Sequence, residues 1–545
     1  MKYKKDYDKI LNKKKGKIME VRVRFAPSPT GQVHIGNIRT AIFNWLFARH
    51  EKGKFLIRVE DTDLERSTQD AKDKLFECMD WLGLDYDEDV MYQSQNSGKH
   101  IDITKEMIDK NQAYYLPVAE GEKAPLAFRI PISDDISSIR TVGNAEFAVH
   151  QDEPVKIDFT GISFAQISKK RKAIPVSACL AGFKNLKIYD AENNEIFDLD
   201  SNINDIISGK SEFMFANAAK FQFTRKEVFF NDMIKGELSK PLDSMKDLII
   251  VRGNGSPVFH IANVCDDIEQ KVTHIVRGDD HVENTYRHLL LFDAIGGIAP
   301  IYAHMPMIVN QQGKPYSKRD GDAFVGDFKA KGFLPNALFN YLSLLGWSPG
   351  DDREKMTIEE LVEAFQLEKV QSSPAQLDMK KLENMNGQYL MDMDSAEFAK
   401  KAYELSKDCE YLKDVEFEYF AKVALLMQPR TKLITQLDSW KYFFTTDFEY
   451  NEKALKKQFK KDEIKEGIAK LAEIFANLAD FNAENIIGEI HKLEEELGLG
   501  QYKLMQPLRL AISGVTGGAD LDATIIVLGK DIVCKRITDL LGKLG

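Results

Sequence analysis

The sequence predicts an α/β fold, a doubly wound Rossmann-type parallel sheet split by a β-containing insertion and followed by an α-helical C-terminal region. Three observations predict it. Short alternating apolar runs are followed by helical spacing in the first part of the chain, the same order returns after about residue 226, and helical spacing dominates from Pro335 onward. Strands joined through helices pair in parallel, because a long crossover returns the chain to the same end of the sheet.

The first half of the sheet is predicted in residues 19–115 and the second in residues 226–325. In the first half we expect strands at 20–25 and 55–59, a helix from about Asn37 and a helix at 68–81. Pro27, Pro29 and Gly31 break the first strand. In the second half, the apolar runs of the sheet resume at 248–251, 257–264 and 272–276, and a helix is expected at 284–295. Residues 116–225 differ in texture and predict a mostly β insertion.

Composition limits the class of protein. The 545 residues suggest three or four domains, and 43% hydrophobic with 29% charged residues is ordinary for a globular protein. No apolar run is long enough for a bilayer, so no membrane role is expected. The net charge of −11 neither favours nor excludes nucleic acid, because phosphate contacts depend on local patches. Five scattered cysteines without a CxxC pair predict reduced thiols, a cytoplasmic protein and no zinc site.

Residues 1–18 form a lysine-rich N-terminal extension, and Met19 stands just before the first predicted strand. We interpret this extension as an upstream addition or a misassigned start, and a basic arm that binds nucleic acid is the alternative.

The turn at residues 26–37 joins the end of a strand to the start of a helix. Such a helix start offers free N–H groups and partial positive charge, which suit a phosphate. Gly36 allows a nucleotide to approach the backbone, and His34 is placed to donate to a phosphate oxygen as charge develops there. The alternative is structural: Asn37 as a simple N-cap and His34 as a polar loop residue.

The residues around this turn resemble the opening of a bacterial-type glutamyl-tRNA synthetase. The similar segments are RFAPSPTG at 24–31, HIGN at 34–37, IRVEDTD at 57–63, DWLGL at 80–84, HIVRGDDH at 274–281, LLGWSPGDD at 344–352 and PLRLA at 507–511. They occur in the family's order and cover about 20–115, 226–390 and parts of the remainder. The resemblance implies a class I aminoacyl-tRNA synthetase. Such an enzyme joins L-glutamate to ATP, with Mg²⁺, as glutamyl-adenylate and then transfers glutamate to the terminal ribose of tRNA.

A second signature in the family resembles GKPYSKR at residues 313–319. The resemblance assigns catalysis to His34, Ser317 and Lys318. It assigns ATP binding to His34, Gly36, Asn37, Lys314, Lys318 and Arg319. Pro315 stands where the family usually has another lysine, and Asn37 replaces the last histidine of the commonest class signature. A solvated basic turn is the bland alternative for residues 314–319.

Glutamate recognition requires guanidinium groups, since arginine forms bidentate pairs with carboxylates. Arg24 and Arg277 each end a predicted strand and are expected to converge at the sheet's carboxyl edge. The resemblance places the amino acid at Arg24, Ser28, Glu60, Phe259, Asn263 and Arg277. Glu60 would receive the ammonium group, and Phe259 stands where the family commonly has tyrosine. Surface salt bridges are the alternative for the two arginines, and no metal site is expected at Glu60, Asp61 and Asp63.

The resemblance also suggests the domain organisation. Residues 116–225 would form an enlarged acceptor-arm-binding insertion, 326–390 a stem-contact domain and 391–545 a helical anticodon-binding domain. The basic run at 168–172 is a charged turn or an acceptor-arm contact. The expected partners are tRNA, ATP and L-glutamate, and the family is usually monomeric.

Three alternatives remain open. A tRNA-independent adenylylating enzyme would not need more than 200 residues after Arg319. A glutaminyl-type enzyme would have a β-barrel-like anticodon module, whereas residues 398–545 have a helical pattern. A non-catalytic tRNA-binding protein would not need His34, Ser317 and Lys318 intact.

Overall fold

The computed structural model describes residues 20–62, 67–116, 118–131, 136–148, 155–158, 180–207, 212–406, 408–435, 437–446 and 448–544. The N-terminal extension, Met19, Asp63, Cys179 and the basic run at 168–172 lie outside these residues. The chain forms two compact units. The first comprises Met1–Gly326 and Leu342–Leu377, and the second comprises Asp327–Tyr341 and Asp378–Gly545.

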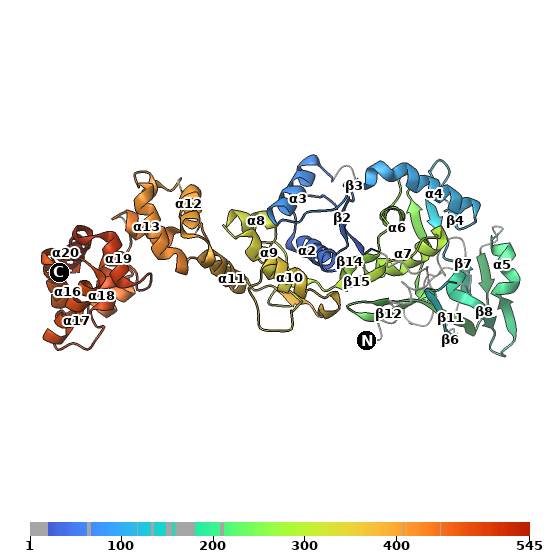
Figure 1. Ribbon diagram of the computed structural model, residues 1–545. Coiled ribbons are helices and arrows are strands. Elements are labelled where there is room, and N and C mark those ends of the chain that lie inside the picture. The colour runs from blue at the N-terminus through green and yellow to red at the C-terminus, as the bar shows by residue number, and fades with distance from the viewer. Residues whose placement is uncertain are drawn as a thin grey trace. The chain divides into compact units, whose positions relative to one another are not determined.

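Parallel strands form the centre of the first unit (Figure 1). They are β1 (Arg22–Phe25), β2 (Lys54–Val59), β3 (Met91–Tyr92), β14 (His274–Gly278) and β15 (Ile301–Met305). They form two hydrogen-bonded sets, β1-β2-β3 and β14-β15, the second of which continues into β11 (Lys220–Asp232). β2 pairs in parallel with both β1 and β3, and β14 pairs in parallel with β15. β14 lies beside β1, because the backbone N–H of Thr273 donates to the carbonyl of Arg22 at 2.9 Å. The predicted doubly wound parallel fold is confirmed.

Helices cover this sheet. They are α2 (Ile35–His50), α3 (Gln69–Trp81), α4 (Ser97–Asp109), α6 (Phe259–Glu269) and α7 (Val282–Ile295). α2 begins two residues before the predicted start and buries most of its side chains. α3 is capped by Thr68, whose hydroxyl accepts from the backbone N–H of Ala71 at 3.2 Å. α7 ends at Gly296, which has the left-handed φ of 79° that glycine tolerates.

Two expectations for the second half of the sheet are wrong. The apolar run at 257–264 is not part of the sheet, because α6 begins at Phe259 and buries Ile261, Ala262 and Val264 as one helical face. An apolar helix and a buried strand share this pattern over such a short run. The run at 248–251 is a strand, β13 (Leu248–Val251), but it pairs antiparallel with β5 (Leu126–Phe128), outside the parallel order.

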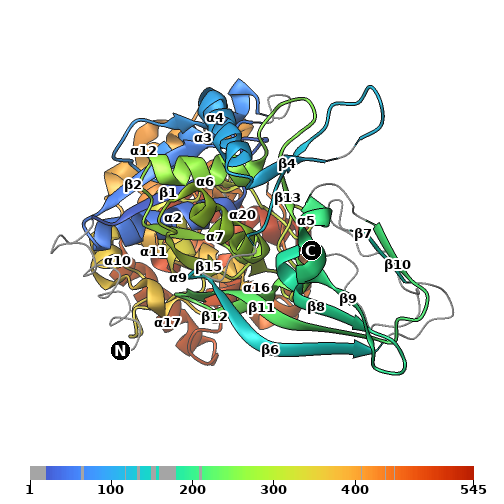
Figure 2. The same cartoon turned by 90° about the vertical axis from the view of Figure 1, so that its right-hand side faces the viewer.

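The insertion is mostly β, as predicted. β4 (Ala113–Tyr115), β5 and β13 form one small sheet. The remaining strands are β6 (Ile139–Ala148), β7 (Val155–Asp158), β8 (Lys184–Tyr189), β9 (Glu195–Asp198), β10 (Glu212–Phe215), β11 (Lys220–Asp232) and β12 (Gly236–Pro241). The long strands β6 and β11 run side by side to β8, β9 and the helix α5 (Leu199–Ile207), as Figure 2 shows. This end has its own apolar core, which includes Phe183, Leu186 and Phe223.

Short elements complete the first unit and lead into the second. They are β16 (Ile308–Val309), α8 (Val325–Ala330), α9 (Pro335–Leu344), α10 (Ile358–Ala364) and β17 (Ala375–Gln376). β16 pairs in parallel with β17. Thr357 and Glu360 form a reciprocal capping box at the start of α10.

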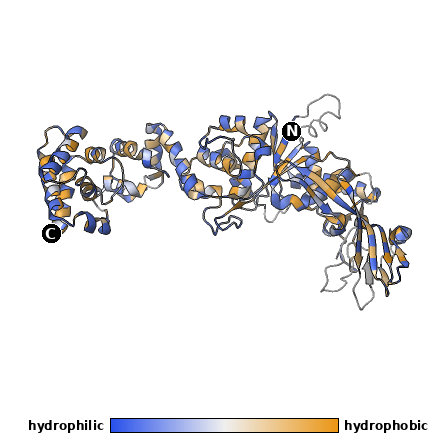
Figure 3. Cartoon of the chain, turned by 90° about the horizontal axis from the view of Figure 1, so that it is seen from below, coloured by the Kyte–Doolittle hydropathy of each residue, from blue (hydrophilic) through white to orange (hydrophobic). Residues whose placement is uncertain are grey.

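The described part of the C-terminal region after residue 378 is helical. Its helices are α11 (Met379–Asp392), α12 (Ser395–Ser406), α13 (Phe417–Met427), α14 (Lys441–Phe444), α15 (Glu452–Gln458), α16 (Asp462–Asn477), α17 (Ala483–Glu496), α18 (Met505–Ser513), α19 (Leu521–Leu528) and α20 (Lys530–Leu544). Along these helices hydrophobic and hydrophilic residues alternate, as Figure 3 shows, and the buried ones share a core around Trp440, Leu471 and Ile537.

Candidate active site

His34 is the N-cap of α2. Its Nδ1 accepts from the backbone N–H of Gly36 at 3.1 Å, so the neutral ring carries its proton on Nε2. Burial lowers the pKa of His34, and the interaction with the Tyr316 backbone, which acts to raise that pKa, is the smaller effect. A Cβ at position 36 would lie 3.3 Å from His34 Nδ1, so glycine leaves this ring uncrowded. The structure therefore makes His34, and not Asn37, the capping residue.

The expectation of free N–H groups at the start of α2 is wrong. Ile35 donates its backbone N–H to the carbonyl of Ala323 at 2.9 Å, and Asn37 donates to the carbonyl of His34 at 3.0 Å. Gly36 donates to the His34 ring. The helix dipole remains, but donors for a phosphate must come from side chains such as the Nε2–H of His34.

The loop that carries Ser317, Lys318 and Arg319 is organised by Asp320. One carboxylate oxygen of Asp320 accepts from the Ser317 hydroxyl and from the Ser317 backbone N–H, both at 2.9 Å, and the other accepts from the Asn310 side chain at 2.7 Å. The hydrogen bonds from Asn310 and Ser317 lower the pKa of Asp320. The basic side chains of Lys314, Lys318 and Arg319 are exposed. Ser317 thus shapes the loop and leaves the basic side chains to face solvent or a ligand.

The two predicted ATP signatures meet in the first unit. His34 and Phe324 form an antiparallel bridge, and Val325 donates its backbone N–H to the carbonyl of Val33 at 3.0 Å. The rings of His34 and Phe324 meet edge to face with centroids 6.1 Å apart. The Lys318 ammonium lies 5.7 Å from the centroid of the same Phe324 ring. The structure therefore brings His34 and Lys318 into contact with the same aromatic ring.

Arg24 lies in a buried cluster with two residues that the sequence interpretation missed. Asp267 Oδ1 accepts from Arg24 Nε at 2.9 Å and from Arg58 Nη1 at 2.5 Å. All three side chains are at most 4% exposed. Burial raises the pKa of Asp267, but Arg24 and Arg58 outweigh it, and the net shift is downward. Arg24 is thus already paired with a carboxylate of the chain.

Glu60 and Asn263 join this cluster. Asn263 donates its amide N–H to Glu60 Oε1 at 2.5 Å, and its carbonyl oxygen accepts from Arg24 Nη2 at 3.4 Å. Burial raises the pKa of Glu60, and Arg58 and Arg24 oppose that rise. The backbone N–H of Glu60 donates to the carbonyl of Pro27 at 3.0 Å, which ties the end of β2 to the turn after β1. Three predicted glutamate-binding residues, Arg24, Glu60 and Asn263, therefore lie together.

Arg277 has a different environment, because its partners are all neutral. Its Nε donates to His304 Nε2 at 3.2 Å. Its Nη2 donates to Thr285 Oγ1 at 2.7 Å and to the carbonyl of His281 at 3.2 Å. Burial lowers the pKa of Arg277 to about 10, so the guanidinium stays charged at neutral pH. Among the described residues no carboxylate forms an ion pair with it.

The remaining predicted residues lie apart from these hydrogen bonds. Phe259 is the first residue of α6, and its ring contacts those of His260, His281 and His288. Ser28 is exposed on the turn after β1. Asp61 is structural: it accepts from Lys72 Nζ at 2.7 Å and from the Ser94 backbone N–H at 2.9 Å.

Within the described ranges, no group of three or more His, Cys, Asp or Glu side chains is arranged to hold a metal ion. No helix in the same ranges is both long and apolar enough to span a membrane.

The missed residues share a signal in the sequence. Arg58 and His304 are ionisable residues within apolar runs, Asp267 follows Asp266 on a largely apolar helix, and each of the three is almost completely buried. Charged residues are rarely buried unless they are paired, so such positions indicate a buried network. The pattern identifies the residues but not their partners.

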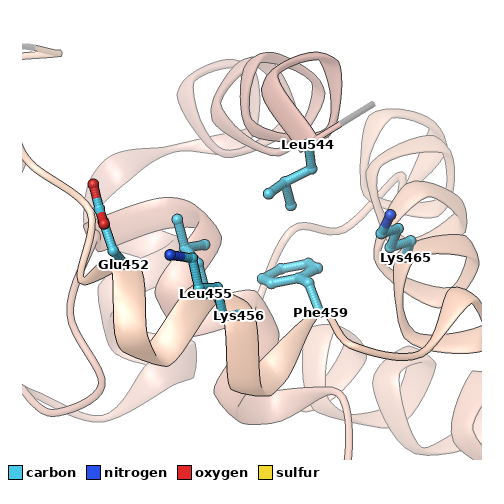
Figure 4. Close-up of a pocket in the computed structure, with 6 residues that line it drawn as sticks. All are labelled: Glu452, Leu455, Lys456, Phe459, Lys465 and Leu544. Atoms are coloured by element: carbon cyan, nitrogen blue, oxygen red, sulfur yellow. The ribbon is translucent and has the colours of Figure 1, made fainter.

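The second unit contains a separate cavity and a surface ion pair. A cavity of about 210 Å³ is lined by Glu452, Leu455, Lys456, Phe459, Lys465 and Leu544 (Figure 4). All of these residues belong to the second unit, whereas the predicted catalytic residues belong to the first. Arg430 Nη2 lies 3.0 Å from Asp520 Oδ1 on the surface of the same unit.

Comparison with known proteins agrees with the fold and the paired signatures, which define a class I aminoacyl-tRNA synthetase. A family described as "tRNA synthetases class I (E and Q), catalytic domain" matches residues 20–122 and 216–384, and an "Anticodon binding domain" matches residues 397–541. The chain belongs to this E and Q family of class I tRNA synthetases.

Its relatives include a glutamate–tRNA ligase of Neisseria meningitidis serogroup A, which is 35% identical over 526 residues, covering 95% of this chain and 100% of its own. Glutamate–tRNA ligase 1 of Caldanaerobacter subterraneus is 32% identical over 95% of this chain and 97% of its own. A crystal structure of the glutamate tRNA ligase of Elizabethkingia meningosepticum, in complex with its amino acid, has a TM-score of 0.71 and 27% identity, covering 97% of this chain and 100% of its own. The glutamate-tRNA synthetase of Elizabethkingia anophelis has a TM-score of 0.69, with 27% identity and coverage of 96% and 100%.

Proposed function

We propose that this chain is a glutamate–tRNA ligase, which activates L-glutamate with ATP and transfers it to the 3′-terminal ribose of tRNA. The observation that carries this proposal is the buried guanidinium of Arg277, whose described hydrogen-bond partners are all neutral. A buried cation that no carboxylate contacts directly is costly, and an anionic ligand offsets that cost. The relatives named glutamate–tRNA ligase support the same substrate.

Arg277 and Glu60 would divide the recognition of glutamate. The side-chain carboxylate pairs with Arg277, because Arg24 already has a carboxylate partner in Asp267 and Arg277 has none among the described residues. The ammonium group pairs with Glu60, which Asn263 holds through its amide N–H. Glutamine has no negative side chain to compensate Arg277, so the geometry favours the acid over the amide. Ser28 and Phe259 would line the site without a described hydrogen bond to this cluster.

ATP enters as its Mg²⁺ complex, so the metal belongs to the substrate. The α-carboxylate of glutamate attacks the α-phosphorus of ATP. Pyrophosphate leaves and carries the negative charge that develops in the transition state. His34 donates to the phosphates through Nε2–H, and Lys318 places an ammonium near the leaving pyrophosphate. Gly36, Asn37, Lys314 and Arg319 complete the predicted ATP site, and Ser317 keeps the loop in shape through Asp320.

The remaining parts would serve tRNA. We assign residues 116–225 to the acceptor arm, 326–390 to the stem and 391–545 to the anticodon, in a protein that acts as a cytoplasmic monomer. The helical pattern of the last segment favours the glutamyl over the glutaminyl type. The family resemblance implies that the adenylate forms only with tRNA bound, and we expect this dependence here.

ATP–pyrophosphate exchange tests this function. Exchange should require both L-glutamate and glutamate tRNA, and charging of tRNA should follow. Arg277→Ala should raise the KM for glutamate by about tenfold to a hundredfold and leave the KM for ATP within about twofold, since a bond to a charged group is lost. Arg252→Ala, an exposed arginine elsewhere in the first unit, is the control. Exchange with glutamine in place of glutamate, or vigorous exchange without tRNA, contradicts the proposal.

A further inference from the structure

Two of the three guanidinium nitrogens of Arg277 are held in place by the protein. Nε donates to His304 Nε2, and Nη2 donates to Thr285 Oγ1 and to the carbonyl of His281. No described residue accepts a hydrogen bond from Nη1. Nη1 is also not one of the fully buried polar atoms without a partner, so part of its surface is accessible. Nη1 is therefore the atom that is left for a ligand.

The contact with Arg277 determines the protonation of His304. A guanidinium nitrogen only donates, so His304 Nε2 must accept and the ring proton must lie on Nδ1. Nδ1 lies 2.7 Å from Asp232 Oδ2, which accepts that proton's hydrogen bond. Burial lowers the pKa of His304, although Asp232 acts in the opposite direction. A second proton on Nε2 would face the Nε–H of Arg277 and would bring two cations together.

Asp232 is itself fixed at the end of β11. Its Oδ1 accepts from the backbone N–H groups of Ile234 and Lys235, both at 2.9 Å. The Asp232 and His304 side chains are 0% exposed. The Tyr302 ring stacks on His304 with centroids 5.8 Å apart and an interplanar angle of 4°, and it lies 5.4 Å from the Arg277 guanidinium. The ring of His304 therefore has little freedom to rotate or to exchange partners.

We propose that Asp232 is a positioning residue for amino-acid selection: it fixes the tautomer of His304, and His304 then aims the free Nη1 of Arg277 at the side-chain carboxylate of the substrate. The proposal rests on the proposed function, in which Arg277 binds that carboxylate. Asp232 touches no substrate atom and acts through two intervening side chains. Metal sites use comparable carboxylate–histidine pairs to orient a functional group.

Replacing Asp232 with Asn isolates this role. The Asn oxygen keeps the bonds from Ile234 and Lys235, so the turn after β11 is preserved. The Asn amide presents an N–H to His304 Nδ1, which then must accept. The ring proton moves to Nε2 and meets the Nε–H of Arg277, so two donors face each other and the guanidinium shifts. The backbone N–H of His304 donates to Asp232 Oδ2 at 3.0 Å and to Oδ1 at 3.2 Å, and in the variant the Asn oxygen remains as its acceptor. The side-chain volume stays nearly constant.

Steady-state exchange with tRNA present should show a selective loss. Asp232→Asn should raise the KM for glutamate by about tenfold to a hundredfold, with the KM for ATP within about twofold and the melting temperature little changed. The side-chain amide of His304→Gln reaches the position of Nε2, so its oxygen can accept from Arg277. The shorter amide of His304→Asn reaches only the position of Nδ1, where its N–H can donate to Asp232 but its oxygen cannot reach Arg277. Gln should therefore retain more glutamate affinity than Asn. Equal shifts in the two KM values, or the reverse order for Gln and Asn, overturn the proposal.

Two further measurements separate this proposal from the function on which it rests. In the Arg277→Ala background, Asp232→Asn should add no further rise in the KM for glutamate, and an additive rise overturns the proposal. Nitrogen-15 spectra of labelled histidine should show the Nδ1–H tautomer for His304 and the Nε2–H tautomer in Asp232→Asn. An Nε2–H tautomer in the unmodified protein also overturns it.

If Arg277→Ala leaves the KM for glutamate unchanged, the proposed function fails. If only Asp232→Asn is silent, the positioning role alone fails.

Discussion

Phe324 contacts both His34 and Lys318: its ring meets the His34 ring edge to face with centroids 6.1 Å apart, and its centroid lies 5.7 Å from the Lys318 ammonium. His34 and Lys318 belong to the two predicted ATP signatures, whereas Phe324 lies outside both and the sequence interpretation did not single it out. Backbone hydrogen bonds on both sides of the contact, from Ile35 and Val325, hold the two segments together. One aromatic side chain thus couples the helix start to the basic loop.

Phe324→Ala should weaken that coupling. The variant loses the edge-to-face contact with His34 and the contact with Lys318. If misalignment costs the transition state about as much as one such contact, roughly 0.5–1.5 kcal/mol, adenylate formation should fall about twofold to tenfold. ATP–pyrophosphate exchange with tRNA present measures the rate. Phe324→Tyr, which keeps the ring, is the control and should stay near the unmodified rate. A full rate in Phe324→Ala would mean that the backbone bridge alone aligns the two signatures.

Lys318→Ala should lower the rate of adenylate formation by about 10²–10³, because the ammonium stabilises charge that develops on pyrophosphate. Binding of tRNA should change little. Pro315 has no charge and no backbone N–H to share this role, and it bridges to Val309 in the structure. Lys314→Ala is the matched control, because this exposed lysine lies in the same loop. A crippled Lys314→Ala beside a mild Lys318→Ala would show that the predicted register of the loop is wrong.

Asp267→Asn should strongly destabilise the protein, because Arg24 and Arg58 would stay buried without their common carboxylate. Breaking a buried pair typically costs about 3–5 kcal/mol. The pKa of Asp267 is lower in the folded state than in the unfolded chain. The stabilisation from ionised Asp267 is therefore fully present above the ordinary carboxylate pKa, and it is lost as the pH falls through the lowered pKa of the folded state. Calorimetry should therefore show a gap in melting temperature between the unmodified protein and the variant that narrows in acid. Asp293→Asn, at an exposed position on α7, should melt like the unmodified protein at each pH.

Arg536→Met should destabilise the helical second unit. Arg536 Nη1 donates to the carbonyl of Ile512 at 2.5 Å, and Nη2 donates to those of Tyr442 at 2.6 Å and Thr445 at 3.1 Å. Methionine fills similar space but leaves these acceptors unpaired, which we expect to cost roughly 2–3 kcal/mol. Urea unfolding followed by far-ultraviolet circular dichroism measures the loss. Lys543→Met, at an exposed position on α20, should differ from the unmodified protein by less than about 0.5 kcal/mol.

Much of the fold follows from local pattern. Alternation in residues 20–25 and 55–59 predicted β1 and β2 within two residues of their bounds, and Thr68 marked the start of α3. The run at 257–264 was placed in the sheet because a short apolar run fits both a strand and a buried helix. The partner of β13 was also beyond prediction, because pairing depends on which strand lies alongside in space.

The sequence by itself determined the class of fold, the family resemblance and the positions of His34, Lys318, Arg24 and Arg277, because those signals lie in contiguous residues. Only the tertiary structure decided which groups surround each of these two arginines. Arg24 shares Asp267 with Arg58, whereas Arg277 has only neutral partners. Charge compensation depends on distance in space, and residues far apart in the chain become neighbours only when the sheet and its helices have packed.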